Sequence, residues 1–364
     1  MNANLQDKIR GCLLGGAVGD ALGYPIEFET NIKDKQVTKY QNNRGIISDD
    51  TQMTLFTANA LLWRETRWHL RGIAMTPPEA IYFGYLDWLS TQERVKEPPK
   101  ITWIRNIPSL NVLRTPGNTC ITALESGKMG LLGEPINDSK GCGGIMRLAP
   151  IGLYINTEDN IGNFSAMSCA ITHGHPLAIL SAYVLGLIIT FVTLQNQTIE
   201  TAVKNAKDKM LAWQPDAWKD GEKVRINWQI EKTELESLID LSLALAKENQ
   251  KDTAAIKKLG QGWVAEEALT IAIYSCVKYQ DNFQDAIVCA VNHDGDSDST
   301  GAIAGNIIGG KLGLDKIPSY YRDHIELKDV ILELADDIYH GVPTDQNGNI
   351  TDKTWLEKYV IINE

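Results

Sequence analysis

Apolar residues recur at three- and four-residue steps along most of this chain, the spacing that gathers them on one face of an α-helix. Residues 50–64 show this register clearly. Four later segments repeat it: residues 234–247, 263–279, 283–292 and 327–339. Alternating runs typical of strands occur only at residues 45–48 and 223–229, and strands do not alternate with helices. The pattern predicts an all-α fold, a compact multi-helix orthogonal bundle of roughly a dozen helices.

One segment, residues 176–194, carries no charged residue and is nearly long enough to cross a bilayer. Neither flank has the Lys/Arg cluster or the aromatic belt that marks a membrane span. Its small residues Ser181, Ala182 and Gly186 suit close helix packing. A helix that is apolar on all sides is also what a large core contains. We therefore expect a buried central helix and no membrane partner.

Glycine-rich stretches separate the helical segments and are expected to be loops: residues 15–23, 116–119, 140–144 and 292–301. Residues 91–115 and 214–229 are interpreted as excursions from the core, and neither has the length of a separate domain. The 364 residues, 43% hydrophobic and 22% charged, have a globular composition. We expect a single domain over residues 1–364.

The formal net charge is −11, from 35 Lys and Arg against 46 Asp and Glu. An acidic chain gains nothing from counterion release on a phosphate backbone, so nucleic acid is not expected as a partner. The six cysteines include no CxxC pair, which favours free thiols in a reducing compartment. The first residues lack a cationic and apolar leader, so we expect a cytoplasmic protein.

Two acidic motifs lie far apart in the sequence, each just before an apolar helical segment. The first is Ser48-Asp49-Asp50-Thr51, and the second is the run DGDSDSTG at residues 294–301. One Asp or Ser at a helix start is explained by capping of the free backbone N–H groups. Five carboxylates over two such positions exceed what capping needs.

Carboxylates packed together repel one another, and their pKa values rise unless a cation neutralises them. Oxygen ligands without a Cys or His pair suit Mg²⁺ or Mn²⁺ better than Zn²⁺. An EF-hand starting at Asp294 fails, because Ser299 stands at its sixth position and Gly305 at its twelfth. Two joined motifs could hold a pair of metal ions for hydrolysis. Spacing alone leaves this dimetal cleft and two capped helices equally open.

Seven motifs appear in order: GCLLGGAVGDALGYPIEF (residues 11–28), SDDTQM (48–53), PGNT (116–119), GCGGIMRLAPIG (141–152), THGHPLA (172–178), GWVAEEAL (262–269) and GDSDSTGAIAGNIIGG (295–310). Together they resemble the ADP-ribosylglycohydrolase family, which includes the dinitrogenase-reductase-activating glycohydrolases. The resemblance runs from about residue 8 to residue 315. It implies an all-α enzyme that binds two Mg²⁺ or Mn²⁺ and cleaves the glycosidic bond between ADP-ribose and a protein side chain.

By position, the resemblance implies six metal ligands: Ser48, Asp49, Asp50, Asp296, Asp298 and Ser299. Thr300 could replace Ser299 in a shifted register. Serine at positions 48 and 299, where many members have threonine, resembles the ADP-ribosylarginine-hydrolysing branch, so modified arginine is the expected substrate. The catalytic residues implied are Asp49, Asp298 and Glu27, the last in a segment that resembles the flap of the family. One of the three would receive the proton of the attacking water.

The resemblance also implies residues that line the ADP-ribose cleft: Gly117, Asn118, Thr119, Gly141, Cys142, Gly143, Gly144 and Met146. Glycines there would let backbone N–H groups approach the diphosphate. His173 falls where members place a histidine against the ribose and phosphate. We expect Asp20 to bind backbone N–H groups and Arg147 to form an internal salt bridge. Glu266 is expected on a solvated face or in a buried ion pair.

Two rival functions stay open. Some similar proteins are immunity proteins that bind an ADP-ribosyltransferase toxin as well as reversing its modification, which would make a cognate toxin a partner. The excursions at residues 91–115 and 214–229 could form such a surface. The second rival is a metal-dependent phosphohydrolase that attacks the diphosphate itself and releases AMP rather than intact ADP-ribose.

Overall fold

The structure, a computed structural model, describes residues 3–29, 36–94, 97–154, 158–219 and 222–360. The α-helices of these residues are α1 (Ala3–Gly23), α2 (Asp49–Arg71), α3 (Pro77–Thr91), α4 (Asn118–Glu125), α5 (Ala149–Leu153), α6 (Glu158–Ala170), α7 (Pro176–Ile189), α8 (Ile199–Ala212), α9 (Gln229–Leu245), α10 (Asp252–Leu259), α11 (Ala265–Lys278), α12 (Phe283–Val291), α13 (Ser297–Leu312), α14 (Ser319–His324), α15 (Lys328–His340) and α16 (Lys353–Tyr359). Short 3₁₀ turns include Tyr24–Ile26 and Cys142–Gly144. The predicted all-α fold is confirmed, with sixteen described helices rather than a dozen.

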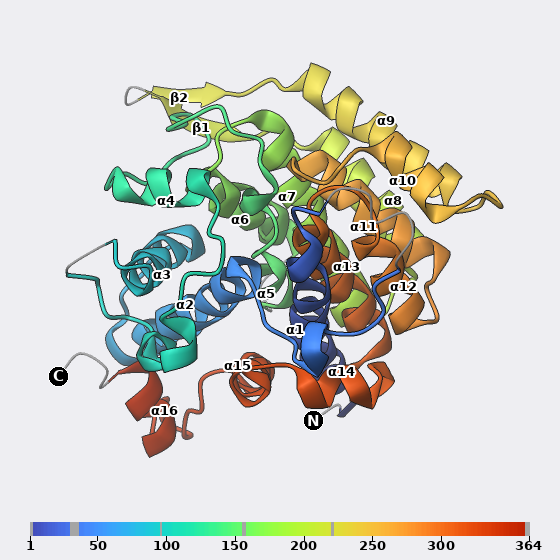
Figure 1. Cartoon of the computed structure of the whole chain (residues 1–364). Helices are drawn as coiled ribbons and strands as arrows, with labels where there is room; N and C mark the ends of the chain where they lie inside the picture. Colours follow the sequence, from blue (N-terminus) through green and yellow to red (C-terminus); the bar gives the residue numbers. More distant parts are fainter. Residues whose placement is uncertain (1–2, 30–35, 95–96, 155–157, 220–221, 361–364) are drawn as a thin grey trace.

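The described residues also form one antiparallel hairpin, β1 (Asp216–Lys219) and β2 (Glu222–Arg225), in which Asp216 pairs with Arg225. The hairpin lies inside the predicted excursion at residues 214–229. The alternating run at residues 223–229 overlaps β2, but no sequence pattern indicated β1. Figure 1 shows the hairpin and α9 along one edge of the molecule, opposite α14, α15 and α16. The α1 and α13 helices run side by side through the middle.

The expectation of a glycine loop at residues 15–23 is wrong, because these residues belong to α1. Their glycines face glycines of α13 instead. A Cβ atom at Gly19 would lie 1.9 Å from the carbonyl oxygen of Gly301, and one at Gly15 would lie 2.4 Å from that of Gly305. Glycine is disfavoured inside a helix by about 1 kcal/mol relative to alanine, but only glycine permits this backbone contact. The pair fixes the end of α1 beside the start of α13.

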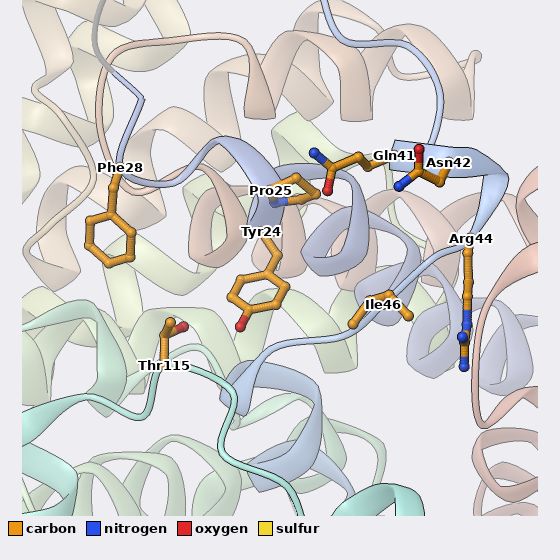
Figure 2. A pocket seen from close by; sticks show the side chains of 8 residues that line it. All are labelled: Tyr24, Pro25, Phe28, Gln41, Asn42, Arg44, Ile46 and Thr115. Carbon is orange, nitrogen blue, oxygen red and sulfur yellow. The ribbon is translucent and has the colours of Figure 1, made fainter.

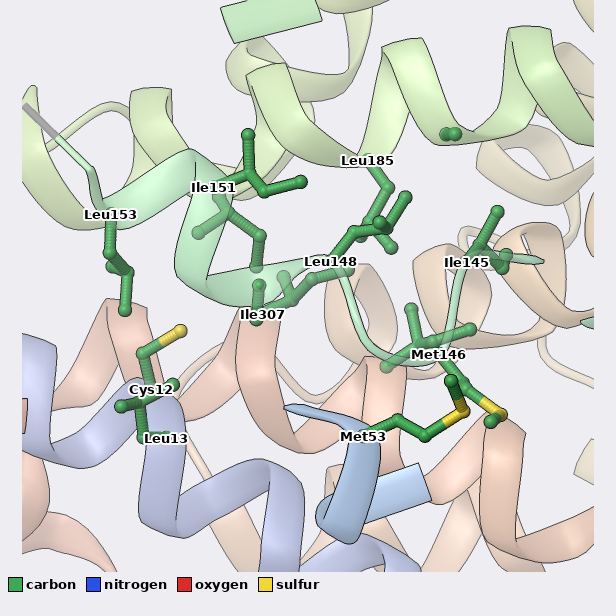
Figure 3. Packing of buried hydrophobic residues seen from close by; sticks show 14 of the residues in the cluster. Cys12, Leu13, Met53, Ile145, Met146, Leu148, Ile151, Leu153, Leu185 and Ile307 are labelled. Atoms are coloured by element: carbon green, nitrogen blue, oxygen red, sulfur yellow. The ribbon is translucent and has the colours of Figure 1, made fainter. Parts of the chain in front are cut away.

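The predicted central helix at residues 176–194 is confirmed as part of the core. It comprises α7 and a π-helical continuation, Thr190–Leu194. Of the helices in the described segments, this is the one long and apolar enough to cross a membrane, and 94% of the apolar window is buried inside the protein. Figure 3 shows Leu185 of this helix packed over Leu148 and Ile151, with Met53 of α2 in the same cluster. The core thus lies directly beneath the first turn of α2.

The stretch at residues 91–115 is not a simple excursion. Ile104 and Leu110 are fully buried, and the carboxylate of Asp87 in α3 accepts hydrogen bonds from the backbone N–H groups of Ile101 and Thr102. The segment therefore returns its apolar side chains to the core. It ends at residue 115, three residues before α4 begins at Asn118.

Candidate active site

The first acidic motif is held in place by a buried carboxylate of α1. Asp20 is fully buried and accepts hydrogen bonds from the backbone N–H groups of Ser48 (3.0 Å) and Thr51 (3.1 Å) and from the Thr51 hydroxyl. The Ser48 hydroxyl in turn accepts from the N–H of Asp50 at 3.2 Å and caps α2. Asp20 therefore binds backbone N–H groups as expected. The turn is fixed with Asp49 and Asp50 in the first turn of the helix.

The second acidic motif is a capped helix start as well. Asp296 caps α13, and both Asp296 (3.2 Å) and Asp298 (3.0 Å) accept from the N–H of Ser299. Thr300 has its hydroxyl within 2.8 Å of the carbonyl oxygens of Ala290 and Asp296. Because the Thr300 hydroxyl is occupied by backbone groups, Ser299 is better placed than Thr300 to offer an oxygen to a ligand.

The two motifs meet in space, with Glu27 between them and the solvent. Carboxylate oxygens of Glu27, Asp296 and Asp298 all lie within 4.8 Å of one another. The Asp50 carboxylate forms a hydrogen bond with Ser299, and its charge raises the pKa of Asp298. The predicted ligands of both motifs, together with Glu27, thus form one acidic cluster.

The acidic cluster is electrostatically uncompensated. Burial, followed by the charge of Asp296, raises the pKa of Glu27 to about 8, and burial raises that of Asp49 to about 8. Among the described residues no Lys, Arg or His forms an ion pair with these carboxylates. Asp50 Oδ2 is buried and has no hydrogen-bond partner. An oxygen-only donor set with an orphaned carboxylate oxygen fits a hard divalent cation.

Cys142 adds a contact that the sequence did not indicate. Its thiol donates a hydrogen bond to Asp296 Oδ2 at 2.6 Å, and its backbone N–H donates to the carbonyl of Trp263 at 3.1 Å. Trp263 in turn stacks on Phe28, with ring centroids 5.8 Å apart. Both aromatic residues stood inside quoted motifs, but nothing in their spacing marks them as neighbours. They place an exposed aromatic pair at the rim of the acidic cluster.

The predicted cleft loops lie on the other side of the acidic cluster. The N–H of Gly117 donates to Asp49 Oδ2 at 3.2 Å, and Asn118 and Thr119 begin α4. Gly141–Gly144 pack against the ring of His173: a Cβ atom at Gly144 would lie 3.1 Å from its Cγ. Met146 is buried, with Sδ 3.9 Å from the Ser299 hydroxyl, so it supports the cluster from below.

Arg147 differs from the prediction. No carboxylate of the described chain pairs with it, so the expected internal salt bridge is wrong. Its guanidinium instead lies 4.5 Å from the ring centre of Tyr85 and donates to the Thr172 hydroxyl. Glu266 is buried and does form an ion pair, with Lys140, whose side chain is 38% exposed. Spacing could not distinguish these two cases, because the partner of each charge comes from a distant segment.

A cavity of about 600 Å³ adjoins the acidic cluster on the Glu27 side. Figure 2 shows its lining side chains: Tyr24, Pro25, Phe28, Gln41, Asn42, Arg44, Ile46 and Thr115. The Thr115 hydroxyl lies 3.5 Å from Glu27 Oε2 and is also hydrogen-bonded with Tyr24. Thr115 thus connects the cavity to the cluster. Sequence reasoning missed it, although it directly precedes the PGNT motif.

The mostly helical fold matches that of a solved structure. A solved structure described as "ADP-ribosylglycohydrolase-related protein complex" shares the fold, with a TM-score of 0.64 and 21% identity over 93% of this chain and 99% of that chain. The sequence model of the ADP-ribosylglycohydrolase family matches residues 1–348, and the chain belongs to this family. The predicted family is confirmed.

Characterised relatives span nearly the whole chain. ADP-ribosylarginine hydrolase Tri1 of Serratia proteamaculans is 25% identical over 93% of this chain and 80% of its own length. ADP-ribosyl-[dinitrogen reductase] glycohydrolase of Rhodospirillum rubrum is 23% identical, with 89% and 92% covered. Human ADP-ribosylhydrolase ARH3 is 21% identical, with 89% and 90% covered. The chain is an ADP-ribosylglycohydrolase, an enzyme that hydrolyses the glycosidic bond of ADP-ribose.

Proposed function

We propose that this enzyme removes ADP-ribose from modified arginine side chains, with two Mg²⁺ or Mn²⁺ held by the acidic cluster. The observation that supports it best is the meeting of Ser48–Asp50 with Asp296–Ser299, two turns separated by more than 200 residues. The ligands proposed are Ser48, Asp49, Asp50, Asp296, Asp298 and Ser299. When bound, the cations would orient the ribose hydroxyls and acidify the attacking water.

Arginine is favoured as acceptor by the serines at positions 48 and 299 and by the Serratia relative that is named an ADP-ribosylarginine hydrolase. The chemistry agrees. Positive charge develops on the sugar in an oxocarbenium-like transition state, and the guanidine leaves as a cation. An acidic rim that includes Glu27 stabilises both charges. A strongly basic leaving group also needs little help from a general acid.

The residues of the chain have separate tasks in this proposal. Asp49, Asp298 or Glu27 would receive the proton of the attacking water, because all three carboxylates belong to the acidic cluster. The start of α4 at Asn118 and the loop at Gly141–Gly144 line the site proposed for the diphosphate. Thr115 orients Glu27 from the side of the adjoining cavity.

The test is a panel of arginine-, serine- and thymidine-linked ADP-ribose, assayed with Mg²⁺ and with a chelator. We expect intact ADP-ribose to be released from the arginine conjugate, with activity lost in the chelator and restored by Mg²⁺. Release from serine alone would refute the arginine assignment. AMP among the chromatographed products would identify the rival phosphohydrolase.

A further inference from the structure

Arg147 is a buried cation that lacks a carboxylate partner throughout the described segments. Its Nη1 donates to Cys120 Sγ at 3.0 Å and lies 3.5 Å from Met53 Sδ, and its Nε has no hydrogen-bond partner. Its Nη2 donates to Thr172 Oγ1 at 2.5 Å. Buried guanidinium groups are normally neutralised by a carboxylate, since the desolvation cost is several kcal/mol. The retained charge of Arg147 therefore calls for another explanation.

Thr172 connects this cation to His173. A guanidinium group can only donate, so Thr172 Oγ1 accepts from Arg147 and has one hydrogen left to give. The same oxygen lies 2.8 Å from His173 Nδ1. The Cys120 thiol is also close, but sulfur is a much weaker acceptor than an imidazole nitrogen. The second lone pair of Oγ1 could accept from an Nδ1–H, but the free hydroxyl hydrogen equally allows Thr172 to donate to Nδ1, which then carries a lone pair.

The electrostatic field of Arg147 favours the same arrangement. A positive charge stabilises a lone pair on the ring nitrogen that faces it and disfavours a proton there. Burial, with a further contribution from Arg147, lowers the pKa of His173 to about 3, so the ring is neutral at physiological pH. A neutral ring carries a single proton, and with Nδ1 acting as acceptor that proton lies on Nε2.

The Nε2 atom faces the glycine loop of the cleft. A Cβ atom at Gly141 would lie 3.3 Å from Nε2, and one at Gly143 would lie 3.5 Å from it. Because both residues are glycine, no side chain fills this space. Nε2 has no hydrogen-bond partner in the described part of the chain. A fixed donor thus points toward the loop that the proposed function assigns to ADP-ribose.

We infer that Arg147 and Thr172 are positioning residues that hold His173 as the neutral Nε2–H tautomer, so that it donates one hydrogen bond to an oxygen of ADP-ribose beside Gly141 and Gly143. The presence of ADP-ribose at this loop rests on the proposed function; the tautomer does not. The buried charge of Arg147 thereby acts on the ligand without touching it. A neutral donor also binds the ligand without a protonation step.

The tautomer is measured directly by long-range ¹H–¹⁵N correlation spectra of ¹⁵N-histidine-labelled protein without ligand. His173 is identified by the signal that disappears in His173→Gln. We expect an unprotonated Nδ1 and a protonated Nε2 in the wild type and in Thr172→Ser, which keeps the hydroxyl. Thr172→Val should show a mixture of tautomers or the Nδ1–H form. A protonated Nδ1 in the wild type, or an unchanged tautomer in both Thr172→Val and Arg147→Met, would overturn the inference.

Binding of ADP-ribose, followed by calorimetry, tests the second half. Loss of one neutral hydrogen bond should weaken binding about 3- to 10-fold in Thr172→Val and leave Thr172→Ser near wild type. Thr190→Val is the matched control, because this buried hydroxyl donates only to the backbone carbonyls of Gly152 and Gly186. If ADP-ribose binds without shifting the His173 signals, His173 is not the donor. If ADP-ribose does not bind at all, the proposed function fails. The tautomer of His173 is still tested separately by the spectra of the ligand-free protein.

Discussion

The acidic cluster and the surroundings of Arg147 are opposite solutions to the burial of charge. Within the part of the chain that the structure describes, the cluster gathers buried carboxylates without a cationic side chain, and the Asp50 Oδ2 atom has no hydrogen-bond partner. Arg147 is a buried cation without a carboxylate, and it is surrounded instead by a Tyr85 ring, two sulfur atoms and the Thr172 hydroxyl. Arg147 forms no ion pair with the carboxylates of the acidic cluster in the described chain. Its Nη1 atom lies against Met53 Sδ and Cys120 Sγ instead.

The difference shows what each region requires from outside the chain. Clustered carboxylates repel one another, so the acidic cluster gains stability from any added cation. The Arg147 guanidinium is surrounded by soft and neutral groups, and in our inference its charge orients a neighbour. In the proposed function the acidic cluster is therefore the binding site, and the Arg147 region supports the neighbouring cleft.

The largest expected effect comes from Asp298→Ala. Loss of a metal ligand should lower the rate of ADP-ribose release from modified arginine at least about 100-fold. Mg²⁺ should stabilise the wild type by about 2.7 kcal/mol at one hundred times its Kd, and this gain should disappear in the variant. Enzyme assays and thermal unfolding with and without Mg²⁺ measure both quantities.

Asp294→Ala is the matched control, because Asp294 stands in the same motif but is not one of the proposed ligands. It should keep both the activity and the stabilisation by Mg²⁺. Full turnover in Asp298→Ala and in Asp49→Ala would show that the acidic cluster does not carry the reaction.

The next effect concerns the acid side of the stability profile. The folded pKa of His173, about 3, lies below the unfolded value of about 6.5, so the unfolded state binds the proton first as the pH falls. The contribution of His173 to the free energy of unfolding is therefore constant above about pH 6.5 and decreases as the pH falls below it. From pH 7 to pH 5 the wild type should lose about 2 kcal/mol more free energy of unfolding than His173→Gln. Urea titrations of both proteins at pH 7 and pH 5 measure this difference. If the free energy of unfolding falls equally in both, the His173 ring is not held neutral by burial.

The smallest effect separates the two regions. Arg147→Met keeps the length of the side chain and removes its charge, so the tautomer of His173 is no longer enforced. We expect ADP-ribose affinity to fall about tenfold, the equivalent of roughly 1.4 kcal/mol. The affinity for Mn²⁺ alone should not change, because the acidic cluster keeps its ligands. Calorimetric titrations with each ligand test this, and an equal loss of both affinities would mean that the two regions are one unit.

The sequence predicted the helical fold, because helical periodicity depends only on residues that are close together in the sequence. It also predicted which residues form the acidic cluster, since unusual acidic motifs at helix starts and the family resemblance mark them. It could not predict the partners of Arg147 or the contact of Cys142 with Asp296, which depend on segments far apart in the chain. The glycines of residues 15–23 misled for a related reason. Glycine marks a loop by its local preference, and only the facing glycines of α13 show that it marks a helix contact here.

The α1–α13 contact has a consequence for how such enzymes can diverge. The α1 helix, which carries Asp20 and leads to Glu27, contacts α13 backbone to backbone. The first turn of α13 carries Asp298 and Ser299. An added methyl group at Gly15 or Gly305 would separate the helices and shift the acidic cluster, which begins about one to two turns away. Positions that never meet the substrate are thus as tightly constrained as those that do, and tolerance to substitution in this protein does not increase simply with distance from the reaction.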